Sequence, residues 1–105
     1  MSRDYRTYLR DIEQSCGLVE HATQANSTVD LLNDRDACDS LMKSLSVIVD
    51  SARHIPENAR ERIEGVDWNS VFSLEDIADL EPDQVDEAIR ILIPRLHFAV
   101  ENCTL

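Results

Sequence analysis

The chain has 105 residues, and its 10 Lys and Arg against 21 Asp and Glu give a formal net charge of −11. Its 43% apolar content excludes an acidic disordered tail, which would have too little to bury. Two Gly and three Pro are too few for the many corners of an all-β fold. The length is that of one domain, and we expect a single domain over residues 1–105.

The charge and the apolar pattern also bear on partners and location. A surface at −11 repels phosphate backbones, so we expect no direct binding of nucleic acid. No run of 18 apolar residues occurs, and residues 1–20 carry charges throughout. We therefore expect no membrane span, no signal peptide and a cytoplasmic location.

The first segment predicts a long amphipathic helix. Its apolar residues are spaced 4, 3, 4 and 3, as on one face of a helix. They are Tyr5, Leu9, Ile12, Cys16 and Val19. Ser2 is suited to cap the start, and Asp4 suits the first turn. Residues 26–28 end this helix and cap a short one over residues 29–33.

The second long segment carries a wider apolar stripe, which Pro56 ends. The stripe is Cys38, Leu41, Leu45, Ile48, Ala52 and Ile55, widened by Met42, Val47 and Val49. A helix that is apolar over more than half its surface is central or shared with a second subunit. We therefore expect Leu41, Leu45, Ile48 and Ala52 to form a core face or a dimer face.

Two short helices and one long helix are predicted after Pro56. Residues 56–64 predict a short polar helix closed by Gly65, and another short helix begins near Asp67. The last long helix opens at Pro82 and contains Pro94, which should kink it or force the freed carbonyl onto another donor. Its stripe is Val85, Ile89, Leu92, Leu96, Ala99 and Cys103. The pattern predicts an all-α, antiparallel helical bundle of three long helices plus one or two short ones.

No pattern in the chain indicates a metal site or a cofactor. The cysteines and histidines are scattered, whereas metal ligands are closely spaced, so each Cys is expected to be a small buried hydrophobe. They are Cys16, Cys38, Cys103, His21, His54 and His97. Glycine occurs only at positions 17 and 65, which excludes a glycine-rich phosphate loop. We expect no metal and no cofactor.

The most informative charge feature is an acidic stretch. Between Ile63 and Ile89 there are nine acidic residues and no Arg or Lys. This stretch is interpreted as a solubilising face, as a docking surface for a basic partner, or as a surface that imitates phosphates. The candidate partner-binding residues are Glu75, Asp76, Asp79, Glu81 and Asp83.

Five short motifs, in order along most of the chain, resemble those of HepT-like proteins in the HEPN superfamily. They are Tyr-Leu-Arg-Asp-Ile at 8–12, Asp-Ala at 36–37 with Lys-Ser-Leu-Ser-Val-Ile at 43–48, Ala-Arg-His-Ile-Pro at 52–56, Val-Asp-Trp-Asn-Ser-Val at 66–71, and Val85 to Ile89 with Ile-Pro-Arg-Leu at 93–96. The resemblance implies a HEPN-like four-helix bundle and a homodimer. It also implies a place in a toxin–antitoxin system, in which ribonuclease toxins pair with a nucleotidyltransferase antitoxin.

The chain departs from this family at the active motif. The motif is an Arg followed by a His and often a Tyr, placed between the Trp motif and the last helix. The stretch between Trp68 and Leu80 contains none of the three. RNA cleavage needs a group that moves a proton and a cation that stabilises the phosphorane. The stretch carries carboxylates instead.

Only Arg90 and His97 match the motif's spacing elsewhere in the chain, and they are weak catalytic candidates because Pro94 lies between them. We therefore expect a degenerate HepT-like protein that acts by protein–protein binding. Its expected partners are a second copy and either a basic protein or a nucleotidyltransferase-type protein. Two alternatives remain open at this point: an active ribonuclease with a displaced site, and an acidic inhibitor that imitates nucleic acid.

Overall fold

The computed structural model describes residues 4–103, which form helices joined by short connections. The long helices are α1 (Tyr5–Ala25), α3 (Arg35–His54) and α6 (Pro82–Glu101). The short elements are α2 (Thr28–Asn33), α4 (Glu57–Glu61), α5 (Trp68–Ser73) and the 3-10 helix η1 (Leu74–Asp79). The predicted all-α helical bundle is confirmed, with more short elements in the described residues than the one or two expected.

Side-chain caps set the beginnings of the first helices. Asp4 caps α1 rather than joining its first turn, because its carboxylate accepts the Arg6 backbone N–H at 3.0 Å. Ser2, the predicted cap, lies outside the described residues. The Ser27 hydroxyl accepts the Asp30 backbone N–H at 3.1 Å and caps α2, as residues 26–28 predict.

The connection from α3 to α6 is built from short helical pieces. α3 ends at His54, just before Pro56 as predicted, and α4 ends at Glu61, earlier than the predicted end at residue 64. Gly65 has φ of 86°, a conformation that favours glycine, and it turns the chain toward α5. The Trp68 indole N–H donates to a backbone carbonyl of α4 at 3.1 Å, so it ties α5 to α4.

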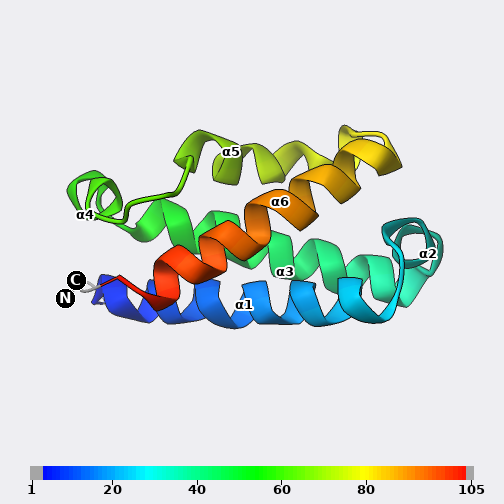
Figure 1. Ribbon diagram of the computed structural model, residues 1–105, viewed down its shortest axis with the longest axis horizontal. Coiled ribbons are helices and arrows are strands. Elements are labelled where there is room, and N and C mark those ends of the chain that lie inside the picture. The colour runs from blue at the N-terminus through cyan, green and yellow to red at the C-terminus, as the bar shows by residue number, and fades with distance from the viewer. Residues whose placement is uncertain (1–3, 104–105) are drawn as a thin grey trace.

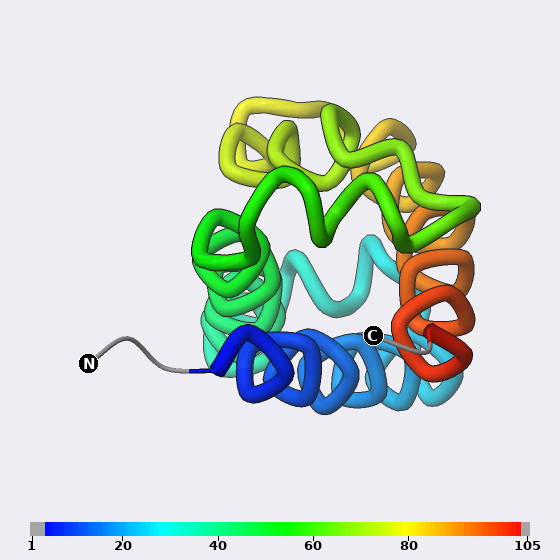
Figure 2. The backbone as a smooth tube through the Cα atoms, turned by 90° about the vertical axis from the view of Figure 1, so that its left-hand side faces the viewer, coloured from blue at the N-terminus to red at the C-terminus, as the bar shows by residue number. Residues whose placement is uncertain are grey.

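The long helices form a bundle with one diagonal member. α1 and α3 lie side by side and run in opposite directions (Figure 1). α6 runs diagonally across them and packs on α1 and α2, and its helical geometry continues through Pro94 (Figure 1). α5 and η1 pack on α3, on the far side of the molecule from α1 (Figure 2). The elements at 68–79 and α6 therefore rest on different helices.

One apolar cluster unites the three long helices. Its largest fully buried side chains are Ile12, Leu45, Ile48, Ile55, Ile89, Ile93 and Leu96. The sequence predicted that Leu41, Leu45, Ile48 and Ala52 form either a core face or a dimer face. The structure places them in the core, because each is at most 3% exposed. Their side chains are covered by the chain itself, so the core alternative of the prediction holds and these four residues offer no surface to a second copy.

A matched pair of isoleucine substitutions tests this core. Ile48→Ala, at a fully buried position, is expected to lower the free energy of unfolding by about 2–5 kcal/mol, because it leaves a cavity. Ile91→Ala, at a position 49% exposed, is expected to change it by less than about 0.5 kcal/mol. Urea unfolding followed by circular dichroism measures both. Equal effects of the two substitutions would contradict the assignment of Ile48 to the core.

Candidate functional site

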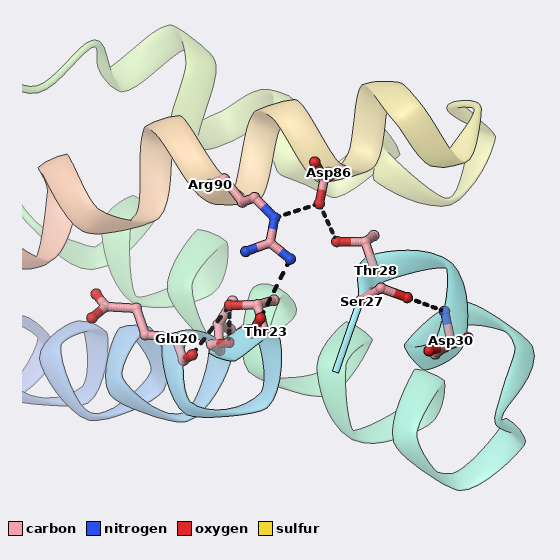
Figure 3. A network of polar contacts seen from close by, with 8 residues as sticks. Glu20, Thr23, Ser27, Thr28, Asp30, Asp86 and Arg90 are labelled. Atoms are coloured by element: carbon pink, nitrogen blue, oxygen red, sulfur yellow. Dashed lines mark hydrogen bonds and ion pairs between the residues drawn. The ribbon is translucent and has the colours of Figure 1, made fainter. Parts of the chain in front are cut away.

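A polar network holds the first half of α6 against α1 and α2. The Asp86 carboxylate accepts the Thr28 hydroxyl at 2.5 Å and the Arg90 Nε–H at 2.6 Å (Figure 3). The Arg90 guanidinium also donates to the Thr23 backbone carbonyl at 3.3 Å. The Thr28 hydroxyl, and then Arg90, lower the pKa of Asp86 below its ordinary value of 3.8. Arg90 therefore already has acceptors on two helices.

His97 makes a second contact between α6 and α1. Its Nδ1 lies 2.7 Å from Glu20 Oε1, and because the carboxylate only accepts, the imidazole donates. Both side chains are less than a third exposed. His97 lies two helical turns beyond Arg90, about 10 Å along the axis. The two weak catalytic candidates thus face the same neighbour, α1, but each is engaged by its own partner.

The five candidate partner-binding acids lie on η1 and at the start of α6, and several already have structural roles. Glu75 pairs with Arg53 of α3. Glu81 is the N-cap of α6, where its backbone N–H donates to the Gln84 side chain at 3.0 Å, and Asp83 lies in the first turn. Asp76 and Asp79 are exposed, and neither side chain makes a hydrogen bond or an ion pair within residues 4–103. These last two acids are therefore fully available to a partner.

An open groove of about 480 Å³ lies between the 65–80 segment and α6. We call it the α5–α6 groove. Its apolar lining comes from Leu74, Ile77 and Leu80 on one wall and from Ala88, Ile91 and Leu92 on the other. Its polar lining is Asp67, Ser70, Ser73, Gln84, Glu87 and Arg95. Neither Arg90 nor His97 lines it, so the groove and the catalytic candidates are separate features of α6.

The three cysteines of the chain lie within the described residues and differ in burial. Burial, and then the nearby Glu20 and Glu13, raise the pKa of Cys16 to about 12, so its thiol is protonated at neutral pH. Cys38 and Cys103 are partly buried rather than fully buried as predicted, and none of the three thiols is in a disulfide.

Within residues 4–103, no group of three or more His, Cys, Asp or Glu side chains is placed to hold a metal ion. None of the helices in that range has the length and apolar composition of a membrane span.

Sequence reasoning missed both the polar network and the groove. The spacing of four between Asp86 and Arg90 was a local signal for an ion pair on one helix. The contacts with Thr23, Thr28 and Glu20 join distant parts of the chain, and no local pattern indicates them. Ile91 was a sequence signal for an apolar surface on α6, because it lies outside the apolar stripe of that helix, and the structure leaves it half exposed.

Comparison with known proteins gives one distant likeness to report. The chain is 24% identical over 101 residues to a Methanocaldococcus jannaschii protein named "Gamma-glutamylcyclotransferase and putative RNase". The alignment covers 91% of this chain but 46% of that protein, so the chain spans about half the length of the curated relative it matches. No family model matches the chain. No solved structure matches it.

The network at Asp86 predicts a pH-dependent contribution to stability. A carboxylate whose pKa is lowered by folding stabilises the protein when the pH is above 3.8, the ordinary pKa of that group. This stabilisation is lost as the pH falls through the folded pKa. Asp86→Asn is therefore expected to destabilise the protein at pH 7, and its deficit relative to wild type should shrink below pH 4. Urea unfolding at pH 7, 4 and 3 measures this deficit.

Asp39→Asn serves as the control, because Asp39 is exposed on α3 and takes no part in the network. A deficit for Asp86→Asn that stayed constant down to pH 3 would contradict the role given to this carboxylate.

Proposed function

We propose that the chain is a HepT-like protein of the HEPN superfamily that acts by binding another protein and does not cleave RNA. The ordered motifs along residues 8–96 support the family. The observation that carries the function is the engagement of Arg90 and His97. Arg90 is bound by Asp86 and the Thr23 carbonyl, and His97 is bound by Glu20. Both side chains hold helices together in this proposal.

The electrostatics of the 68–80 segment support the same proposal. This is where the resemblance places a cation, an imidazole and a phenol, and the chain has carboxylates there instead. Cleavage of a phosphodiester needs stabilisation of the charge that develops on the phosphorus oxygens. Carboxylates repel that charge and also repel the RNA backbone.

The partner in this proposal is a basic protein. Asp76 and Asp79 are exposed and unpaired within the described residues, and they lie in the middle of the acidic stretch. Charge complementarity favours a partner with Lys and Arg on its contact surface and speeds its association. The resemblance points to a nucleotidyltransferase-type protein as one such partner, within a toxin–antitoxin type system.

A homodimer belongs to the proposal as well, on the resemblance alone. Its interface would need apolar side chains that the chain leaves exposed. Leu18 on α1 and Phe98 on α6 are 58% and 69% exposed, respectively. The buried stripe of α3 would take no part in it.

The name of the Methanocaldococcus jannaschii relative favours a second candidate, an RNase that uses Arg90 and His97. In that case the half-exposed Arg90 would leave Asp86 to reach a phosphate. The two candidates differ in one measurable property, the cleavage of RNA by the purified chain.

Incubation of the purified protein with total RNA tests the proposal. Wild type, Arg90→Ala and His97→Ala are expected to leave RNA intact to the same extent as buffer, because each lacks a free catalytic pair. Arg95→Ala, which changes another Arg of the same helix, is the matched control. Cleavage by wild type that is lost in Arg90→Ala and His97→Ala but kept in Arg95→Ala would establish the RNase instead.

A further inference from the structure

The α5–α6 groove combines an apolar floor with exposed apolar edges. Leu80 and Ile91, on opposite walls, are 41% and 49% exposed. Leu74 and Ile77, deeper in the groove, are buried. Exposed aliphatic side chains that border a groove gain free energy when a partner covers them. The groove is therefore suited to bind the apolar surface of a partner, which would remove these side chains from water.

The surroundings of the groove are strongly negative. The wall at 65–80 and the start of the α6 wall belong to the acidic stretch between Ile63 and Ile89, which has nine acidic residues and no Arg or Lys. Glu87 and Asp67 line the groove itself. Arg95 also lines it, four turns along α6 from the connection at 80–81. The charged lining of the groove is thus two acidic residues and one basic residue.

The secondary structure of the walls restricts the form of the ligand. The walls are helical, and their backbone groups are largely bonded within the helices, so they offer no sheet edge to an extended strand. An amphipathic helix needs no backbone partner, because its own backbone groups are satisfied internally. It can place apolar residues at spacings of three and four along such a groove.

We propose that the α5–α6 groove binds an amphipathic helix of a partner protein, with apolar residues on its buried face and Lys or Arg along its edges. This inference rests on the proposed function, and it names the part of the basic partner that is recognised. A second copy of this chain is not the proposed occupant, because the homodimer of the proposed function would meet through Leu18 and Phe98, which lie outside the groove lining. The basic edge residues lie nearest Glu87.

A fluorescein-labelled peptide of about 18 residues tests the inference. The peptide carries Leu at the helical spacing and Lys at the flanking positions. A second peptide has Glu in place of each Lys, and a third has the basic composition in scrambled order. The basic helical peptide is expected to bind, as measured by fluorescence anisotropy, and rising salt should weaken it. The other two peptides are expected to bind at least about tenfold more weakly.

Variants of the protein locate the peptide. Ile91→Asp, inside the groove, and Glu87→Lys, on its edge, are each expected to weaken binding about tenfold. Val29→Asp adds the same charge to an apolar side chain that is 48% exposed and lies outside the groove lining, and Asp39→Lys makes the same charge reversal on α3. Both controls are expected to bind as wild type does. Circular dichroism confirms that each variant is folded.

Several results would overturn the inference. They are equal binding of the scrambled peptide, an unchanged affinity in Ile91→Asp, and no binding of the basic helical peptide at all. Light scattering adds one more: a homodimer that Ile91→Asp dissociates would mean that a second copy fills the groove. The proposed function fails separately, by RNA cleavage. If Asp76→Lys with Asp79→Lys abolished peptide binding while Ile91→Asp did not, acidic docking would stand and the groove would not be its site.

Discussion

The contacts of α6 with α1 and α2 fix the position of α6, and the α5–α6 groove depends on that position. Asp86 binds Thr28, Arg90 reaches the Thr23 carbonyl, and His97 pairs with Glu20. These contacts anchor α6 along α1 and α2, whereas α5 and η1 rest on α3. The two walls of the α5–α6 groove are thus supported by different helices, and the space between them stays open.

The same contacts account for the sign of the exposed charge. α6 has two Arg and one His, and the network uses Arg90 and His97 within the chain. Arg95 is the cation of α6 that lines the groove. The acidic residues of η1 and of the first turns of α6 lie away from Arg95, toward the connection at 80–81, so this side of the molecule attracts cations and repels phosphates. Protein binding and the absence of nuclease chemistry, as proposed, follow from this one arrangement.

The regular helices were predictable because each carries its signal locally. The stripe from Leu41 to Ala52 predicted a helix with a wide buried face, and burial within the chain was one of its two interpretations. The structure was needed to choose between core and dimer, because an apolar face is the same pattern whichever surface covers it. The acids at 75–83 were found from the sequence as a charge run, but the pairing of Glu75 with Arg53 was not. That pairing joins residues far apart along the chain.

The groove was the feature least predictable from the sequence, because long-range contacts set its shape. Its shape depends on the angle between α6 and the 68–79 segment, and that angle is set by long-range contacts such as Thr28 with Asp86. Ile91 gave a partial signal as an apolar residue outside the stripe. Its opposing wall combines α5 with a 3-10 helix, whereas the sequence predicted a short helix that begins near Asp67 and no 3-10 helix.

A double-mutant cycle between Glu20 and His97 tests most directly whether the imidazole holds α6 on α1. Unfolding free energies are measured for Glu20→Ala, His97→Ala and the double variant, with Asp39 and His97 as a distant reference pair. The account predicts a coupling energy of about 0.5–1 kcal/mol for Glu20 with His97 and none for the reference pair. Additive effects at Glu20 and His97 would contradict it, because the imidazole would then be free for another role.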